Sequence, residues 1–539
     1  MTRLLSLCLA LLPAPQDPAP PERGPHWELL PNVELDQRVR AYEAVGASGD
    51  RAQIAVLRDM LRFADTAEEW YRILDAGSAI LGEPLREVEG PWRTLSLRMA
   101  GEEDWPELAD YRAWKGEFYA QFVDRRMRAF FAGDVEPRID LHEIVWGGVS
   151  VDGIPALDDP ETVEAAQADF LDEEEAVFGV VLGGEARAYP LRILDWHEMA
   201  NDSLGGVSFS LAYCTLCGAG VLYRTSIEGR DAPLRFGSSG LLMRSNKLMY
   251  DRISLTLWNQ LTGEPVLGEL AQSGLRLEAL PLVATTWGRW KSQHPDTDVI
   301  STDTGHLRDY RPGASYGAYF GRPGLEFPAP REDRRSYEKE QLYVVRLPAG
   351  TAAVPLPRLR EEGVVRVRVA ETEVTLVCME EPRSQALPAI LSEALGDERQ
   401  IEFVQQLSFE LLRELLEADP ARMEVIDADF LLTLPPSARL PLLEWLASDE
   451  RPLALRITNG LRNRVASYGL AAEVRAFAGA ADIERTGQPP SLVDANGAPW
   501  TMEEEHLSGP AGERLERLSG HLIFGFGFDA YFGDSPILR

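Results

Sequence analysis

The chain has 539 residues, of which 45% are hydrophobic and 26% charged, and its formal net charge is −32. This length exceeds one ordinary core and predicts several domains, and the composition is that of a globular protein. The negative charge argues against nucleic acid or an anionic membrane as a partner. Four cysteines are too few for a disulfide scaffold.

The N-terminus, MTRLLSLCLALLPAPQDPAP, predicts an exported protein. Arg3 gives a positive start, Leu4 to Leu12 form an apolar run of signal-peptide length, and a Pro-rich stretch follows. The cleavage site is weak because Pro15 follows Ala14, and the alternative is an apolar N-terminus on a cytosolic protein. We assign residues 1–22 to a signal peptide and linker and expect a periplasmic or otherwise exported location. No later apolar run reaches the roughly 18 residues of a membrane span.

Residues 23–137 have a helical pattern. The stretch DRAQIAVLRDMLRFADTAEEWYRIL has apolar residues at three- and four-residue spacing. The pattern changes near Gly147, and 138–322 is predicted to be a first β-rich unit. There AVFGVVLGGEARAYPL indicates two strands joined at Gly183 and Gly184, and VSFSLAYC, GVLYRTSIEG and PLRFGSS indicate further strands.

An internal repeat predicts a second copy of this unit. EEAVFGVVLGGEARAYPLRIL, from Glu174, aligns without gaps with KEQLYVVRLPAGTAAVPLPRL, from Lys339, and GLRLEAL later resembles GERLERL. The second, degenerate copy occupies 323–382 and 449–539, and a helical insertion is expected at 383–448. The predicted fold class is α+β, with a duplicated sandwich- or barrel-like β-rich domain after an N-terminal helical region.

One histidine and two cysteines stand close together in LDWHEMANDSLGGVSFSLAYCTLCGAG, namely His197, Cys214 and Cys217. A thiolate pair with an imidazole matches the ligands of zinc or copper, so these residues are predicted metal ligands. Asp195, Glu198 or Asp202 could orient the imidazole. The fourth position is open to a substrate or filled by one of four candidates, namely His142, His294, His306 and Met243.

The two cysteines are also compatible with a role that involves no metal. They could form a redox dithiol or a small disulfide, which export would favour, or they could be inert packing thiols. In the second copy, Cys378 in VTLVC parallels Cys214, but Glu381 stands where a second cysteine would be, and no histidine parallels His197. This difference predicts that the first copy holds the site and the second supports it.

The stretch RFGSSGLLMRSNKLMYDRISLTLWNQLTGE is the other dense polar region and is a predicted pocket wall. Its backbone at 236–240 could hold an anion, or the stretch could be a bulged hairpin with satisfied turns. No Walker loop or Rossmann fingerprint is present. The predicted wall, with one residue of the preceding strand, comprises Tyr213, Phe236, Ser238, Ser239, Arg244, Asn246, Tyr250, Asp251, Trp258 and Gln260.

Several motifs in fixed order resemble the domain of unknown function 3179 family: WHE…ND, YC-x-LC, FG-x-SGLL, MYDR and LW-x-Q. The resemblance covers Gly147 to Tyr319, and more weakly Phe327 to Cys378 and Ser491 to Phe532. It implies an exported bacterial protein with a His/Cys-Cys signature and says nothing about a substrate. Thr215 departs from the family pattern, which has proline after the first cysteine, and this should loosen the turn without removing a ligand.

The preferred hypothesis is a metal-binding protein of the cell envelope that could be an enzyme. The alternative is a non-enzymatic binding or scaffold module in which Cys214 and Cys217 form a structural or redox disulfide.

Overall fold

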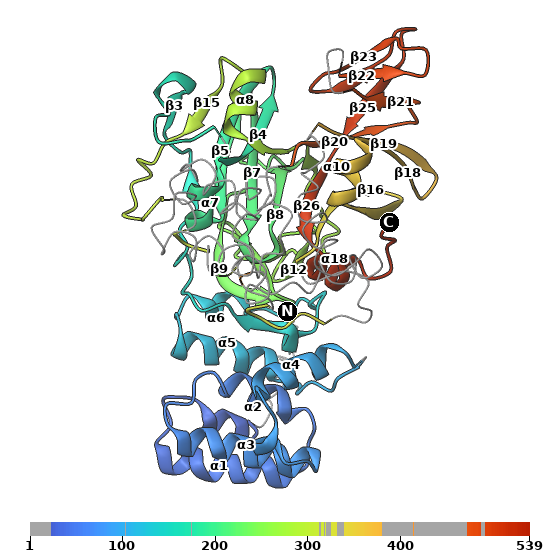
Figure 1. Ribbon diagram of the computed structural model, residues 1–539. Coiled ribbons are helices and arrows are strands. Elements are labelled where there is room, and N and C mark those ends of the chain that lie inside the picture. Colours follow the sequence, from blue (N-terminus) through green and yellow to red (C-terminus); the bar gives the residue numbers. More distant parts are fainter. Residues whose placement is uncertain are drawn as a thin grey trace, which may run out of the picture.

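The computed structural model describes residues 23–379 and 472–539, apart from 103, 174, 312–313, 317–318, 320–324, 331–338 and 487–490, together with residue 413. Helices at one end and several β-sheets make up this part (Figure 1), which confirms the predicted α+β class. The predicted leader at 1–22 and, apart from residue 413, the predicted helical insertion at 383–448 lie outside the described residues.

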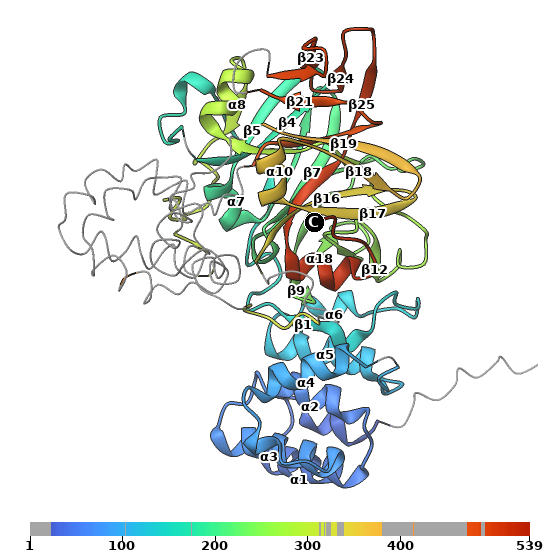
Figure 2. The same cartoon turned by 45° about the vertical axis from the view of Figure 1, so that its right-hand side comes forward.

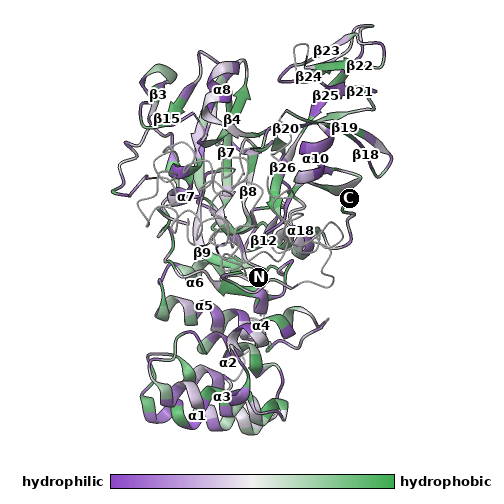
Figure 3. Ribbon diagram, viewed as in Figure 1, coloured by the Kyte–Doolittle hydropathy of each residue, from purple (hydrophilic) through white to green (hydrophobic). Residues whose placement is uncertain are grey.

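The N-terminal region is helical, as predicted. In α3, Thr66 caps the first turn by accepting a hydrogen bond from the Glu69 amide, and Gly82 ends the helix in the left-handed conformation. Both green and purple residues occur on the longer N-terminal helices in Figure 3, as expected where one face packs on a core. The elements are η1 (Pro25–Leu29), α1 (Leu35–Ser48), α2 (Gln53–Met60), α3 (Ala67–Leu81), η2 (Leu85–Glu87), α4 (Pro91–Ala100), α5 (Tyr111–Phe122), α6 (Met127–Phe130) and η3 (Leu141–Glu143).

The first β-rich unit contains the predicted hairpin. Strands β4 (Ala176–Leu182) and β5 (Glu185–Pro190) pair antiparallel and are joined by Gly183 and Gly184, which both have positive φ. Such a turn matches the twist of the two strands and favours glycine. The chain continues through α7 (Leu191–His197), β6 (Met199–Leu204), β7 (Val207–Cys214), η5 (Thr215–Cys217) and β8 (Ala219–Arg224).

The second unit repeats this order of elements. Strands β16 (Gln341–Leu347) and β17 (Gly350–Pro355) form a hairpin, and Leu356–Glu362 forms the helix α10. Next come β18 (Val364–Val369), β19 (Thr372–Cys378) and β20 (Val474–Ala478), paired in that order. Cys378 therefore ends β19 as Cys214 ends β7. This correspondence supports the duplication inferred from the sequence repeat.

The remaining strands complete the five sheets formed by the described residues. Their orders are β1-β9-β10-β11-β12, β13-β8-β7-β6-β2, β14-β4-β5-β15-β3, β17-β16-β26 and β18-β19-β20-β25-β24-β23-β22-β21. Elements not yet bounded in the first unit are β1 (Ile144–Trp146), β2 (Leu157–Asp158), β3 (Thr162–Glu164), η4 (Ala165–Gln167), β9 (Phe236–Met243), β10 (Asn246–Asp251), β11 (Leu257–Asn259), β12 (Pro265–Leu267), β13 (Ala279–Leu280), β14 (Val283–Thr286), α8 (Trp287–Gln293) and β15 (Asp298–Ile300). Those in the second are β21 (Ile483–Arg485), β22 (Leu492–Asp494), β23 (Pro499–Met502), β24 (His506–Ser508), β25 (Arg514–Leu518), β26 (Gly520–Phe524) and α18 (Gly525–Phe532).

The two units share one apolar core. Phe178 and Tyr213 of the first unit belong to the same buried cluster as Leu342, Phe524 and Phe528 of the second. Strand β26 of the second unit lies against β8, a central strand of the first, and α18 follows it near β12 (Figure 2). Both site cysteines belong to this cluster, so the second unit covers the site. No helix in the described part combines the length and apolar character needed to cross a membrane.

His521 gives this shared core a pH dependence. It lies on β26 opposite Val344, and burial lowers the pKa of its imidazole to about 4. Between pH 6.5 and pH 4 the unfolded chain binds a proton that the folded chain does not, so stability should fall over this interval by about 3 kcal/mol. The His521→Leu variant should lose less stability than the unmodified protein when denaturant unfolding is compared at pH 7 and pH 4.5. Equal losses in the two proteins would contradict the assignment.

Candidate functional site

The two cysteines lie at the end of a central strand. Cys214 is the last residue of β7, and Cys217 is the last residue of the single turn η5. Gly218 follows in the left-handed conformation with φ 60°, which lets the chain reverse into β8. Gly220 does not take part in this turn, because it lies within β8, where a Cβ atom would meet the Phe178 ring at 2.5 Å. It serves close packing instead.

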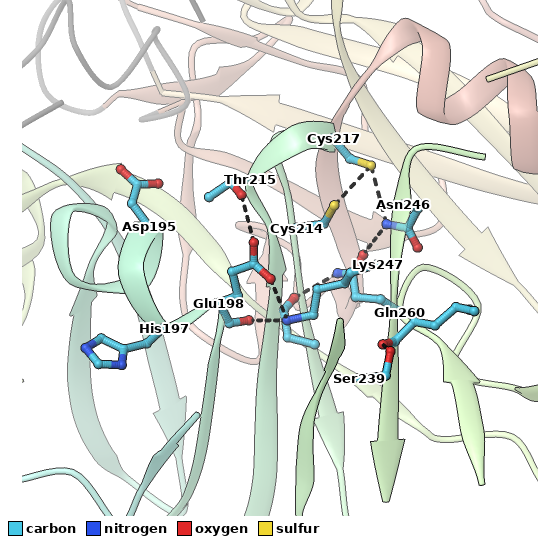
Figure 4. A network of polar contacts seen from close by, with 12 residues as sticks. Asp195, His197, Glu198, Cys214, Thr215, Cys217, Ser239, Asn246, Lys247 and Gln260 are labelled. Atoms are coloured by element: carbon cyan, nitrogen blue, oxygen red, sulfur yellow. Dashed lines mark hydrogen bonds and ion pairs between the residues drawn. The ribbon is translucent and has the colours of Figure 1, made fainter. Parts of the chain in front are cut away.

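The two sulfur atoms face each other inside the protein (Figure 4). Their Sγ atoms are 3.3 Å apart and hydrogen-bonded, and they are not joined in a disulfide. The Asn246 side-chain amide donates to Cys217 Sγ at 3.3 Å, and the Cys217 thiol can donate to the Ser245 carbonyl at 3.5 Å. Cys214 is 2% exposed and Cys217 is fully buried. The pair is therefore closely spaced and shielded from water.

The surroundings shift the pKa values of the two thiols in opposite directions. Burial raises the pKa of Cys214, but hydrogen bonds from the Cys217 thiol and from the backbone amides of Lys247 and Cys217 outweigh it, so the net pKa is lowered. Burial raises the pKa of Cys217, and the neighbouring Cys214 sulfur raises it further. Cys214 is consequently the thiol that ionises first, while Cys217 retains its proton.

A buried ion pair lies beside the cysteines. The Lys247 ammonium group on β10 donates to the Glu198 carbonyl oxygen at 2.8 Å and lies 3.6 Å from the Glu198 carboxylate. Thr215, between the two cysteines, donates its hydroxyl to that carboxylate at 3.1 Å. Glu198 adopts a left-handed conformation with φ 54°, which is unusual for a residue other than glycine. The pair thus ties the turn after α7 to both η5 and β10 (Figure 4).

Asn246 is itself held in place by Gln260. The Asn246 amide donates to Gln260 Oε1 at 2.8 Å, and the Gln260 amide donates to the Ala212 and Ala219 carbonyl oxygens at 2.8 and 3.2 Å. These carbonyls belong to the two strands that flank the cysteine turn. The contacts fix the donor that faces Cys217.

His197 does not join the cysteines, which corrects the predicted three-ligand metal centre. Its ring Nδ1 lies 2.8 Å from the Pro155 carbonyl oxygen and its Nε2 lies 2.6 Å from the Tyr310 hydroxyl. The imidazole points away from both sulfurs (Figure 4). The physical reason is that α7 ends at His197, and its side chain leaves on the side covered by the loop around Tyr310.

The carboxylates expected to orient His197 have other roles, which corrects that prediction too. Asp202 accepts hydrogen bonds from Arg187 and Tyr189, and Glu198 pairs with Lys247. The Asp195 carboxyl group is buried, which raises its pKa to about 8, so it is protonated at neutral pH. None of the three bonds to the imidazole.

Of the four candidates for the fourth ligand, His294 and His142 contact carboxylates elsewhere in the protein. His294 packs on Trp290 and lies 3.3 Å from Glu504. His142 lies at the helical region, with Glu107 3.3 Å from its ring. His306 lies beside His197, with ring centroids 5.3 Å apart. Met243 ends β9, and its carbonyl accepts a hydrogen bond from Tyr531.

Only part of the predicted pocket wall reaches the cysteines. Asn246 does so by a hydrogen bond to Cys217, Gln260 does so only through Asn246, and Tyr213 directly precedes Cys214. The others support the β9–β10 hairpin and its surroundings. Ser239 bonds to Leu248, Arg244 to Glu143, Tyr250 to Asp152, Asp251 to Trp258, the Phe236 backbone to Asn201, and Ser238 pairs with Met249 in the strand register.

The possible anion cradle at 236–240 is an ordinary strand. These residues belong to β9, which pairs with β10 through a register shift between Lys247 and Met249. The hairpin turns at Arg244 and Ser245, which both have positive φ. The bulged-hairpin alternative is therefore the one that describes this stretch.

Among the described residues, one group of three histidine, aspartate or glutamate side chains lies close enough to share an ion, namely Asp140, His142 and Glu143. Arg244 already binds both carboxylate oxygens of Glu143 at 2.7 Å. A guanidinium group held in this way competes with any cation, so this cluster is an ion pair next to a buried histidine.

Sequence reasoning missed Lys247 and Tyr316. Lys247 stands in the buried strand NKLMYD, and a charge in such a strand signals a buried partner. The Tyr316 hydroxyl lies 3.3 Å from the Glu198 carboxylate, but nothing in its local sequence distinguishes it from a packing residue.

Comparison with known proteins gives one match. A family model described as "Protein of unknown function (DUF3179)" matches residues 151–535, which include every residue at the cysteine turn and the ion pair. Neither the curated proteins nor the solved structures contain a match to this chain.

Proposed function

This chain belongs to the DUF3179 family of proteins of unknown function, and we propose that Cys214 and Cys217 form a thiol–disulfide redox centre in an exported bacterial protein. The observation that carries the proposal is the 3.3 Å separation of the two Sγ atoms. A disulfide needs about 2.05 Å, so small side-chain rotations would bring the sulfurs into bonding distance. Export would place the pair in an oxidising compartment, where disulfides persist.

A metal centre would need ligands besides the two sulfurs. The predicted imidazole ligand, His197, is hydrogen-bonded elsewhere through both nitrogens. A dithiol thus fits the arrangement better than a metal centre does.

The unequal acidities of the thiols suit exchange with the disulfide of a small molecule or peptide. The Cys214 thiolate attacks one sulfur of that disulfide, which breaks and releases a thiolate while a mixed disulfide forms. Cys217 then loses its proton and attacks the Cys214 sulfur, releasing the second thiol. Two electrons pass from the dithiol to the partner, which is reduced as Cys214 and Cys217 become a disulfide.

Because the two thiols are buried, the protein must open locally before a partner disulfide can reach them. Tyr319 covers the turn, with its hydroxyl donating to the Leu216 carbonyl at 2.9 Å. A partner must reach Cys214, which is 2% exposed, so we expect exchange to be slow compared with that of an exposed thiol.

Redox titration of the purified protein tests the proposal. After equilibration in glutathione buffers and acid quenching, we expect Cys214 and Cys217 to lose alkylation together in one two-electron step. The midpoint should lie in the range of known dithiol proteins, about −120 to −270 mV. Mass spectrometry can follow the tryptic peptide after Arg192 that ends at Arg224, which carries both cysteines. Two thiols that stay reduced throughout, or that oxidise only after unfolding, would refute the redox role.

Single variants and a third cysteine provide the controls. The Cys217→Ser variant should trap glutathione on Cys214, whereas Cys214→Ser should leave Cys217 unmodified because its thiol is buried and protonated. Cys378 ends the equivalent strand of the second unit with no cysteine three residues later, so its alkylation should stay constant. A stoichiometric metal that is lost in Cys214→Ser would instead support the metal hypothesis.

A further inference from the structure

His197 is oriented as metal-binding histidines are, although it lies away from the cysteines. A carbonyl oxygen only accepts hydrogen bonds, so Nδ1, 2.8 Å from the Pro155 oxygen, carries the proton and donates. Nε2 is then left with a lone pair, toward which the Tyr310 hydroxyl points at 2.6 Å. A backbone carbonyl on one ring nitrogen and an available lone pair on the other are the usual arrangement of a ligating imidazole.

A second imidazole faces the first across a short gap. The rings of His197 and His306 have centroids 5.3 Å apart and planes inclined at 50°. His306 is exposed, and its side chain makes no hydrogen bond or ion pair among the described contacts. Two imidazoles bound at about 2.1 Å to one tetrahedral ion would have centroids about 5.2 Å apart. The spacing therefore matches that of two ligands of one ion.

We propose that His197, His306 and Tyr310 form a transition-metal site with two nitrogen ligands and one oxygen ligand. On binding, the Tyr310 hydroxyl releases its proton to solvent and the ion takes the place of the hydrogen bond to Nε2. The Tyr310 oxygen, now 2.6 Å from Nε2, then moves back to about 3.3 Å, the separation of two nitrogen or oxygen ligands of one tetrahedral ion. Thr304 Oγ1, 2.6 Å from the Tyr310 oxygen, donates to the resulting phenolate. Imidazole with phenolate suits copper(II) or zinc, and exposure of His306 leaves room for a water ligand.

Nearby cations limit the affinity. Arg308 is on the same loop as Tyr310, and its guanidinium lies over the Trp196 ring of α7. Its charge, added to the burial of the imidazole, disfavours positive charge at His197. Asp309, which could offset it, is held by Arg311 through both carboxylate oxygens. We therefore expect weaker binding than at a closed structural zinc site. The site requires no cysteine, so its test does not depend on the outcome of the redox proposal.

Titration of the full chain with Cu²⁺ and Zn²⁺ tests the site, with Cys214→Ser/Cys217→Ser as background so that the thiols of the cysteine pair do not contribute. We expect one equivalent of metal to bind and a visible phenolate-to-copper charge-transfer band to appear. His306→Ala should weaken binding by at least about 10-fold, and Tyr310→Phe should abolish the band. His306 is exposed, so its replacement should leave the fold intact.

His506→Ala provides a matched control, because His506 is a histidine of the distant strand β24. It should leave both the stoichiometry and the affinity unchanged. Failure to bind either metal, equal affinity in His306→Ala, or no band with copper bound would each overturn the proposal. A band that survives in Tyr310→Phe would do the same.

Discussion

Replacement of Lys247 by methionine is expected to lower the free energy of unfolding by about 3–5 kcal/mol, because it leaves a buried carboxylate without a countercharge. The Lys247 side chain is 5% exposed and that of Glu198 is 7% exposed. Thr215 would still donate to the carboxylate, but a neutral hydroxyl replaces little of the charge stabilisation. Methionine matches the length of the lysine stem, so the loss of packing is small. Denaturant unfolding at neutral pH measures the change.

A second substitution separates charge from packing. In Lys247→Met/Glu198→Gln the carboxylate is removed as well, and we expect at least half of the lost stability to return. Arg514→Met serves as the surface control, since Arg514 pairs with Glu516 on β25 where both side chains are more than half exposed. That control should change stability by less than about 1 kcal/mol. A double variant no more stable than Lys247→Met would rule out an unpaired charge as the cause.

The fold was predictable where the signal lay in local patterns. Gly183 and Gly184 between two apolar runs indicated the β4–β5 hairpin, and the gapless repeat indicated the second unit. The position of Cys214 at a strand end followed from the alternation in VSFSLAYC. These features depend on neighbours a few residues apart or on self-similarity, and a single sequence contains both.

The site was predictable only in part because its contacts join distant segments. Cys214 and Cys217 are three residues apart, so their proximity could be inferred. The direction of His197 depends on Pro155, 42 residues before it, and on Tyr310, 113 residues after it. Lys247 lies on β10 and meets Glu198 only because the two sheets pack together. Nothing in the spacing of WHE and YCTLC shows which of these partners His197 or Glu198 takes.

Replacement of Asp59 by asparagine is expected to destabilise the helical region by about 3–5 kcal/mol at pH 7. Asp59 Oδ2 accepts hydrogen bonds from Lys115 at 2.9 Å and from Tyr111 at 2.7 Å, and its Oδ1 lies 3.1 Å from Arg58. The side chains of Arg58, Asp59 and Lys115 are at most 2% exposed. Asparagine keeps the shape of the residue but leaves two buried cations without an anion.

The loss of stability in Asp59→Asn should become smaller as the pH rises, because the buried Lys115 side chain can release its proton. Burial lowers the pKa of Lys115 from 10.5 to about 8 even with Asp59 present, and the variant should lower it further. The folded unmodified protein keeps most of this proton at pH 7 and about half of it at pH 8, whereas its unfolded chain keeps it throughout. Lys115 therefore raises the stability of the unmodified protein by only about 0.4 kcal/mol over this interval. The folded variant has already released the proton while its unfolded chain still holds it, so its stability rises with pH. The gap in unfolding free energy between the two proteins should narrow by about 1 kcal/mol from pH 7 to pH 8.

Hydrogen exchange on α2 and α5 would locate the effect in the helical region, since Arg58 and Asp59 lie on α2 and Lys115 lies on α5. Adding Lys115→Met to Asp59→Asn should remove the extra pH dependence and recover part of the stability, with Arg58 as the remaining unpaired cation. A stability gap that is the same at pH 7 and pH 8 would mean that Lys115 stays charged without Asp59. The buried carboxylate would then not be what holds the charge of this lysine in the helical core.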